Sequence, residues 1–211
     1  MKRLALVFTA LLSFGGIAHA QNVAGAYVGA TIGQSWGTGQ WQFQGAGTSI
    51  DTGPDGWIGG VLAGLNWQSG STVFGVEADV GSGPLSSETS CPNSIFNCKT
   101  EVKWLSTLRG RLGLVNQTAM IYVTGGAAAG DVKVSAHDNF ALGVSDNASK
   151  TMVGWSAGAG IASPASQGLG WRVEWLHTDL GKVDVTLNQL ASTQTVKYKT
   201  DMLRVGLEYR F

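Results

Sequence analysis

Apolar and polar residues alternate along the last stretch of the chain, from Leu203 to Phe211. Successive side chains of a β-strand point to opposite faces, so an extended conformation gives this stretch one wholly apolar face and one polar face. Two aromatic residues, Tyr209 and Phe211, stand at one end of the apolar face. Aromatic rings at such a position are typical of membrane-interface anchors. The pattern therefore predicts a β-strand whose apolar face contacts lipid.

Seven upstream stretches show the same period of two and are joined alternately by long polar stretches and short turns. In an antiparallel sheet successive connections lie at opposite ends, so all long connections fall at one end. Outer-membrane barrels likewise have long connections at the outer end and short turns at the periplasmic end. The sequence predicts an all-β fold, an eight-stranded antiparallel up-and-down transmembrane β-barrel with four long extracellular loops and three short periplasmic turns. The expected strands are 25–33, 56–67, 73–81, 101–115, 119–130, 150–163, 169–179 and 201–211, the long loops 34–55, 82–100, 131–149 and 180–199.

Aromatic residues recur near both ends of the predicted apolar faces. Trp57 and Trp67 lie on one face of the second expected strand. At ~3.3 Å per residue and a tilt near 40°, their separation across the membrane is about 25 Å, the height of an apolar band. We therefore expect an aromatic girdle at each rim, formed by Trp57, Trp67, Trp104, Trp155, Trp171, Trp175 and Tyr209.

The polar faces collect most of the charged residues of the expected strands. An Arg or Lys at the midplane of the lipid face costs about 2 to 4 kcal/mol, so these charges must point into the lumen. The interior of an eight-stranded barrel is barely wide enough for its own side chains, which predicts an ion-paired plug. The set is Glu77, Asp79, Arg109, Arg111, Arg172, Glu174, Arg204, Glu208 and Arg210, with Lys103 near one rim.

For this plug we expect Glu77 to pair with Arg172, and Glu174 to pair with Arg109 or Arg204. The alternative is a narrow gated ion channel in which arginines and glutamates exchange partners. A wide porin channel would need about twice as many strands.

The first twenty residues have the features of a secretory signal peptide. Lys2 and Arg3 precede an apolar run, which ends at the small-x-small triplet from Ala18 to Ala20. This pattern predicts cleavage after Ala20 and leaves residues 21–211 as one barrel domain. An N-terminal membrane anchor fits less well, because the apolar run is short and ends at a cleavage pattern.

Charge and cysteine content narrow the choice of function further. The chain has 14 basic and 14 acidic residues without a basic patch, which argues against nucleic-acid binding. Cys91 and Cys98 lie close together in an exported chain, so we expect a disulfide that staples a loop. No second Cys/His pair stands at a matching spacing, and we predict neither a metal nor another cofactor.

Six stretches of the chain together have a distinctive pattern: YVGA at 27–30, FGVEA at 74–78, LRGRLG at 108–113, YVTGG at 122–126, VEWLHTDLG at 173–181 and RVGLEYRF at 204–211. They resemble the small outer-membrane β-barrel domain family, which includes OmpA-like and OmpX-like barrels and surface antigens of alphaproteobacteria. The resemblance implies an outer-membrane location in contact with lipid and lipopolysaccharide, and a role in envelope integrity or host-surface contact without catalysis. It also implies that the outer-membrane assembly machinery recognises the final strand, which ends at Phe211.

Two other functions compete with a structural, surface-interacting role. A lipid A-modifying enzyme would need a base, for which His177 with Asp179, or His137 in a loop, is available, but the pattern fixes no serine beside them. A secreted lipocalin-like binder would place the apolar faces around an internal cavity and the charges in water. We expect a non-enzymatic barrel whose loops can bind a host surface or a small ligand.

Overall fold

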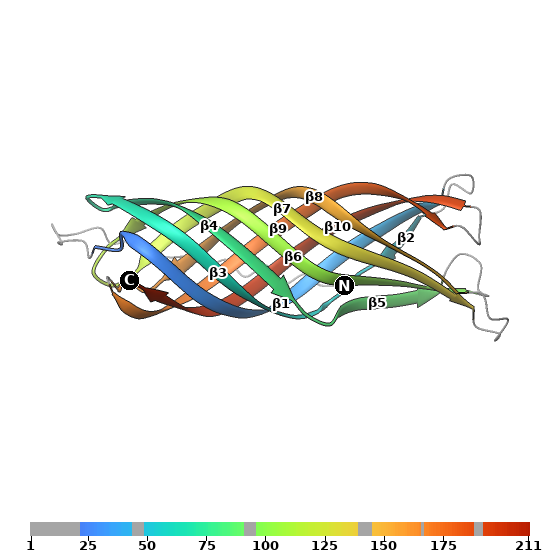
Figure 1. The fold of residues 1–211 in the computed structure, drawn as a ribbon, viewed down its shortest axis with the longest axis horizontal. Coiled ribbons are helices and arrows are strands. Elements are labelled where there is room, and N and C mark those ends of the chain that lie inside the picture. The colour runs from blue at the N-terminus through green and yellow to red at the C-terminus, as the bar shows by residue number, and fades with distance from the viewer. Residues whose placement is uncertain (1–21, 44–48, 91–95, 139–144, 166, 188–191) are drawn as a thin grey trace, which may run out of the picture.

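The computed structural model (Figure 1) describes residues 22–43, 49–90, 96–138, 145–165, 167–187 and 192–211. The described residues form ten strands of one antiparallel sheet, and each pair of neighbours is hydrogen-bonded. The strands are β1 (Gly25–Phe43), β2 (Ser49–Thr52), β3 (Gly56–Ser69), β4 (Thr72–Ser82), β5 (Leu85–Ser90), β6 (Phe96–Val115), β7 (Met120–Asp138), β8 (Ser145–Ala162), β9 (Gly168–Leu187) and β10 (Ser192–Arg210).

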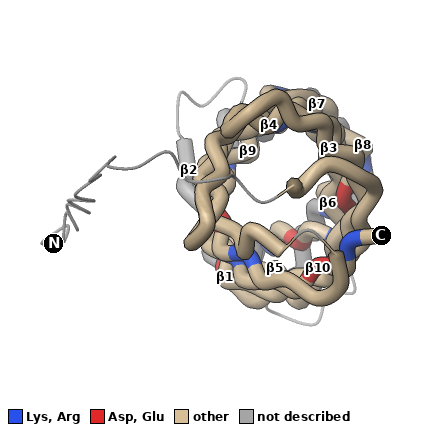
Figure 2. The backbone as a smooth tube through the Cα atoms, turned by 90° about the vertical axis from the view of Figure 1, so that its left-hand side faces the viewer, with Lys and Arg blue, Asp and Glu red and all other residues tan. Residues whose placement is uncertain are grey.

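The predicted eight-stranded barrel is confirmed. Eight long strands follow one another around the ring in the order β1, β3, β4, β6, β7, β8, β9, β10, and β10 closes it by pairing with β1. The closing register runs from Tyr27 opposite Arg210 to Phe43 opposite Gln194. The short strands β2 and β5 pair with the far ends of β1 and β6. Figure 2 shows the closed ring along its axis.

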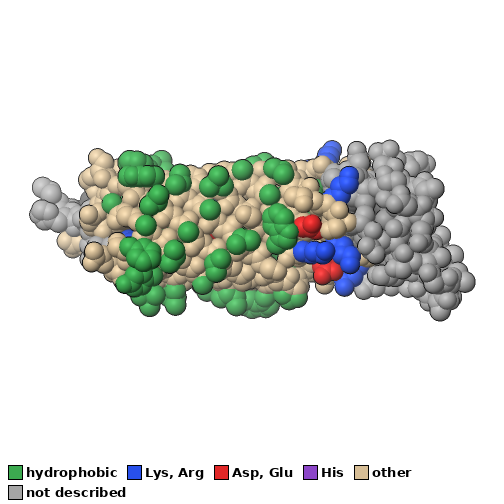
Figure 3. Space-filling model, in the orientation of Figure 1, with side chains coloured by type: hydrophobic (Ala, Val, Ile, Leu, Met, Phe, Trp, Pro, Cys, Tyr) green, Lys and Arg blue, Asp and Glu red, His purple; other side chains and the backbone are tan. Residues whose placement is uncertain are grey.

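The polarity of the barrel is the reverse of that of a soluble protein. On β4, Phe74, Val76 and Val80 are exposed, whereas Glu77 and Asp79 between them are buried. Figure 3 shows apolar side chains spread over the outer surface from the short-turn end to the charged side chains near the opposite end. This placement overturns the lipocalin-like alternative, which requires the charged face outside. Among the described residues, no helix is both long and apolar enough to cross a membrane.

Two of the short turns have clear local causes. Gly70 adopts a positive φ of 61° between β3 and β4, a conformation that costs glycine little because it has no Cβ. Between β6 and β7, the side-chain oxygen of Asn116 accepts hydrogen bonds from the backbone N–H groups of Thr118 and Ala119 at 2.8 and 2.9 Å. Such Asx turns reverse the chain tightly. These turns lie at the end of the barrel where β1 begins and β10 ends (Figure 1).

The predicted long loops were wrong in extent, because much of each is strand. The stretch 34–55 contains the end of β1 and all of β2, and the stretch 82–100 contains β5 and the start of β6. The stretch 131–149 contains the end of β7 and the start of β8, and the stretch 180–199 contains the end of β9 and the start of β10. Serine, threonine and glutamine are frequent in 34–43, 85–90 and 96–100, where hydropathy no longer alternates although the backbone ladder continues, whereas 131–136 and 182–187 still alternate. Polar strand extensions carry little of the period-two signal.

Two neighbouring strands are interrupted at a Gly-Pro pair on the same side of the barrel. Pro54 separates β2 from β3, and Pro84 separates β4 from β5. Proline has no N–H to give to a ladder, which explains why pairing stops at both points. A single bridge between Asp55 and Ser86 links the two interruptions.

One predicted alternation fails near the start of the membrane-facing part of β6. Strict alternation would put Val102 on the outer face with Trp104 and Leu108, but it is buried, and Lys103, which was expected with the inward charges, is exposed. The register against β7 shifts between Val102 and Trp104, which marks one extra residue on β6. A β-bulge of this kind reverses the facing of the residues on one side of it. Trp104 is half-buried.

Candidate functional site in the barrel lumen

Charged side chains from two facing pairs of strands meet in the lumen. β4 supplies Glu77 and Asp79, β6 supplies Arg109 and Arg111, β9 supplies Arg172 and Glu174, and β10 supplies Arg204, Glu208 and Arg210. All nine are buried. Strand alternation places them inward between outward apolar neighbours, and Lys103 is absent from this set because of the β6 bulge.

Arg109 stands at the centre of the charge network. Its guanidinium lies 2.6 Å from Glu77, 2.7 Å from Asp79 and 3.2 Å from Glu174, measured between nitrogen and carboxylate oxygen. It also donates a hydrogen bond to the hydroxyl of Thr124 at 3.2 Å. One cation thus neutralises parts of three carboxylates. Such sharing offsets the cost of burying charge, which a single pair seldom does.

Two more arginines complete the pairing of these carboxylates. Arg172 lies 2.6 Å from Glu77 and 3.0 Å from Glu174. Arg204 lies 2.6 Å from Glu174 and 3.1 Å from Asp79. The contacts expected from the sequence, Glu77 with Arg172 and Glu174 with Arg109 or Arg204, are among those in the structure.

Two tyrosines belong to the network and were not predicted as members. The hydroxyl of Tyr27 donates to Glu77 at 2.7 Å, and the hydroxyl of Tyr122 accepts from Arg172 at 2.9 Å. Their rings lie over Gly64 and Gly160, where an added Cβ would come within 2.4 and 2.5 Å of the ring. The alternation had placed both tyrosines on the inward face. An inward tyrosine that lies beside an inward glycine of the neighbouring strand is the sequence signal that could have identified these two tyrosines.

Arg111 differs from the other arginines. Its nearest carboxylate oxygen, on Glu77, is 4.0 Å away, whereas its guanidinium carbon lies 3.6 Å from the centre of the Tyr122 ring. Among the described residues, its Nε and Nη2 atoms have no hydrogen-bond partner. The five arginines and four carboxylates of this described set give a net charge of +1. Arg111 is the cation without a matching acid.

The predicted girdle residues occupy the outer surface, with one exception. Trp57, Trp67, Trp155, Trp171, Trp175 and Tyr209 are exposed, whereas Trp104 is half-buried beside the β6 bulge. Trp67 stacks on Phe74 at 5.8 Å, and Tyr209 meets Phe211 edge-on at 5.4 Å. Trp36 is also exposed on the outer face of β1. It was missed because the stretch 34–55 was assigned to a loop.

The candidate catalytic pair, His177 with Asp179, does not form. His177 Nδ1 lies 3.0 Å from Asp201 of β10, and Asp179 lies 2.7 Å from Nζ of Lys199. Burial raises the pKa of Asp179, but hydrogen bonds from Lys199 and the N–H of Gly181 outweigh this effect and lower that pKa. Each of these two side chains of β9 therefore contacts a residue of the neighbouring strand β10 and not the other.

The His137 side chain and Cys91 lie outside the described residues, so the disulfide with Cys98 stays a prediction. Among the described side chains, no group of three His, Cys, Asp or Glu residues could hold a metal ion.

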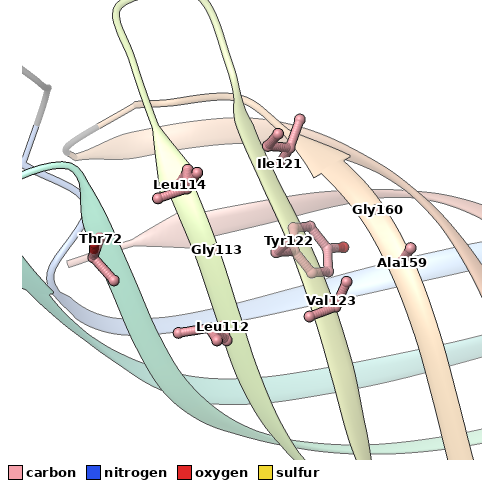
Figure 4. A pocket seen from close by; sticks show the side chains of 9 residues that line it. All are labelled: Thr72, Leu112, Gly113, Leu114, Ile121, Tyr122, Val123, Ala159 and Gly160. Atoms are coloured by element: carbon pink, nitrogen blue, oxygen red, sulfur yellow. The ribbon is translucent and has the colours of Figure 1, made fainter. Parts of the chain in front are cut away.

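A groove of about 510 Å³ indents the outer surface beside the β6–β7 turn (Figure 4). Leu112 and Leu114 of β6 and Ile121 and Val123 of β7 form its walls, and Gly160 leaves room at its floor. The four wall residues are apolar and lie on the lipid-facing side, and Thr72 also lines the groove. The groove therefore presents a mainly apolar surface, as acyl chains require.

A closed barrel with an apolar outer band, aromatic rims and a buried charged lumen defines an integral outer-membrane β-barrel protein. The model of the family described as "Outer membrane protein beta-barrel domain" matches residues 6–211, and the chain belongs to this family. Its location is the outer membrane, as for its relatives.

Relatives and solved structures agree with this assignment. The chain is 38% identical to the 31 kDa outer-membrane immunogenic protein of Brucella melitensis, over 77% of this chain and 70% of that protein. It is 30% identical to the 25 kDa outer-membrane immunogenic protein of Brucella abortus, over 100% and 99% of the two chains. The outer membrane protein OprG of Pseudomonas aeruginosa shares the fold, with a TM-score of 0.50, 12% identity and coverage of 90% and 98%.

Proposed function

We propose that the protein is a non-enzymatic structural component of the outer membrane, which supports envelope integrity and presents a surface for interaction outside the cell. In this proposal its own charged side chains plug the lumen, and the barrel is not a wide pore. The ion pair between Arg172 and Glu77 is the observation that carries the proposal.

This ion pair spans the full width of the lumen. Glu77 is on β4 and Arg172 is on β9, which are the third and seventh strands of the eight-membered ring and therefore stand opposite each other. Their charged atoms are 2.6 Å apart. Arg109 and Glu174 join β6 to β9 in a second crossing. Crossed side chains in direct contact leave little space for a hydrated ion, which supports a closed lumen.

The surface role rests on the relatives and on the extended strands. Two relatives are named immunogenic outer-membrane proteins, and exposure at the cell surface would account for that property. In outer-membrane barrels the longer connections face outside. The ends of the strands opposite the short turns are the part of this chain that such contacts would reach.

Conductance across planar bilayers tests the plug. We expect wild-type protein, inserted and folded as judged by its heat-modifiable gel mobility, to give no steady current. The double variant Glu77→Ala/Arg172→Ala, which empties the central crossing, should conduct small ions. A matched double variant on the lipid face, Val76→Ala/Val173→Ala, should stay closed. Steady porin-like current through the wild-type protein would contradict the proposal.

Processing and assembly complete the proposal. Residues 1–21 lie outside the described residues, and we propose cleavage after Ala20. The mass of the mature protein, measured by mass spectrometry, tests this cleavage site. Phe211 is 64% exposed, and its N–H donates to the carbonyl of Ala26 at 3.1 Å. Its exposed ring is available to the assembly machinery. Deleting Phe211 should therefore slow assembly in cells more than folding in detergent.

A further inference from the structure

A polar groove of about 280 Å³ lies on the outer surface where β1 meets β10 and β9, away from the lumen. Trp36, Thr38 and Gln40 of β1 face outward on one side of it. Lys197 and Lys199 of β10 line the other side, with Gln40 opposite Lys197 and Thr38 opposite Lys199 in the strand register. His177 of β9 and the carboxylate of Asp201 of β10 also line the groove, so two lysines share it with one acid, two hydrogen-bonding side chains, an imidazole and an indole.

A β-bulge on β9 brings a third lysine beside the groove. Lys199 stands opposite Asp179 and Lys197 stands opposite Lys182, so β9 carries an extra residue between these pairs. Gly181, at a positive φ of 73°, occupies the bulge, where a side chain would be strained. In a regular strand Lys182, three residues after the outward Asp179, would face the lumen, and the bulge turns it outward. The bulge therefore concentrates positive charge on the outer surface.

This positive charge is only partly neutralised. Asp179 is engaged by Lys199 at 2.7 Å, and Asp201 by His177 at 3.0 Å. Among the described side chains, neither Lys182 nor Lys197 forms an ion pair. The groove therefore keeps ammonium groups available for an anion.

The depth of the groove relative to the membrane indicates what the anion belongs to. Trp36 shares a cross-strand row with Asp201 and His177, and the His177 ring lies 5.4 Å from that of Trp155. Tryptophans of a girdle sit at headgroup level. Figure 3 shows charged side chains gathered directly beside the apolar surface, on the side away from the short turns. The groove thus lies at the outer-leaflet headgroup level.

An apolar track leads from the groove toward the membrane centre. Leu203 and Val205 continue the outward face of β10 below Asp201, and Ile32 lies opposite Val205 on β1. All three side chains are about half exposed. A ligand with an anionic head and acyl chains can therefore occupy the groove and the track together, whereas a free anion would use only the groove.

We propose that this groove binds a phosphate group of the phosphorylated glycolipid of the outer leaflet. Lys197 and Lys199 contact the phosphate, and ammonium groups are common phosphate ligands in proteins. Thr38 and Gln40 hydrogen-bond to sugar hydroxyls, and the indole of Trp36 packs against the sugar. The site lies outside the lumen and does not depend on the plug.

Native mass spectrometry of the folded barrel in detergent tests this site. The probe is diphosphorylated lipid A, compared with the same lipid after removal of both phosphates. The variant is Lys197→Gln/Lys199→Gln. The matched control is Lys103→Gln/Lys133→Gln, which removes two outward lysines of β6 and β7 elsewhere on the barrel. Heat-modifiable gel mobility verifies that each variant folds.

We expect the Lys197→Gln/Lys199→Gln variant to bind diphosphorylated lipid A about tenfold more weakly than wild type, a loss of about 1.4 kcal/mol. The control should bind like wild type, and the dephosphorylated lipid should not distinguish the three proteins. Equal losses in the variant and the control would overturn the proposal in favour of general charge attraction. The proposal would also be overturned if inorganic phosphate displaced diphosphorylated lipid A as strongly as added lipid A does. Binding of phosphatidylglycerol as tight as that of diphosphorylated lipid A would overturn it as well.

Discussion

Two buried arginines of the same strand should respond very differently to the same substitution. Arg109 and Arg111 are two residues apart on β6, both face the lumen and both are buried. Replacing either one by methionine removes one positive charge and keeps much of the side-chain volume. The pair therefore separates the effect of local contacts from the effect of net charge.

The structure sets the expected magnitudes. Without Arg109, three carboxylates lose a partner within 3.2 Å, although Arg172 and Arg204 still contact them. Breaking a buried ion pair costs about 3 to 5 kcal/mol, and the remaining arginines place Arg109→Met near the lower limit. Arg111 has no close carboxylate, and its cation–π contact with Tyr122 is worth about 2 kcal/mol when desolvated.

Losing Arg111 also removes a cost. Its Nε and Nη2 lack partners among the described residues, and an unsatisfied buried polar group costs about 1 to 3 kcal/mol. The two effects nearly cancel, so Arg111→Met should change the free energy of unfolding by about 1 kcal/mol or less. The difference between the two variants should be at least about 2 kcal/mol.

Urea-induced unfolding in phospholipid vesicles measures this difference, with tryptophan fluorescence and gel mobility as independent probes of the folded barrel. Agreement of the two probes shows that each variant unfolds in one transition. Equal destabilisation by Arg109→Met and Arg111→Met would refute the reasoning, because net charge in the lumen would then matter more than the contacts of each arginine.

Three further predictions concern the wall and the outer rim. Ala63→Arg places a charge on the lipid face between Trp57 and Trp67 and should lower stability by about 2 to 4 kcal/mol, measured by urea unfolding in vesicles. Gly126→Ala brings a Cβ within 2.1 Å of the Leu108 carbonyl oxygen and should cost about 1 to 3 kcal/mol in the same assay. Lys199→Gln should raise the pKa of Asp179, whose native value is lowered by that lysine. The carboxylate contributes to stability at neutral pH, and this contribution is lost as the pH falls from the unfolded-state pKa through the native pKa. In the variant the contribution should therefore be smaller and its loss complete at a higher pH, with the titration of Asp179 followed by carboxyl ¹³C NMR.

Matched controls make these predictions decisive. Ala63→Leu should leave stability nearly unchanged, and equal membrane yields for Ala63→Arg and wild type would mean that the assigned lipid face is wrong. Gly125→Ala should be tolerated, because the nearest atom to an added Cβ there is 3.8 Å away. Similar costs at Gly125 and Gly126 would disprove the close-contact explanation. An unchanged pKa of Asp179 would show that Lys199 does not control that carboxyl.

The barrel could be predicted from the sequence wherever its outer face meets lipid. Along β4, for example, Phe74, Val76 and Val80 contrast sharply with Glu77 and Asp79, because lipid excludes the charges from one face. Where the strands extend beyond the lipid, the contrast between the two faces weakens. Hydropathy therefore does not reveal that the polar residues there are still paired in strands. The same limitation hid Trp36, which lies on β1 within a stretch expected to be a loop.

The members of the lumen network were predictable, but several details of the site were not. Inward charge follows from the period of two, as for Arg172 and Glu174 on β9. The β-bulge on β6 breaks that period without a distinctive residue, which is why Lys103 was expected inside. His177 was matched with Asp179 on its own strand, whereas each of the two contacts a residue of β10. Partners across strands depend on register, and register is fixed by the whole sheet.

The strand extensions determine how the surface end of the protein is presented. β10 has 19 residues, and at ~3.3 Å per residue with a tilt of about 40° it rises roughly 48 Å along the barrel axis, nearly twice the ~25 Å apolar band. About 20 Å of hydrogen-bonded wall therefore continues beyond the apolar band. Contact with lipid depends on the band alone, so substitutions in this outer wall should leave the membrane anchor intact.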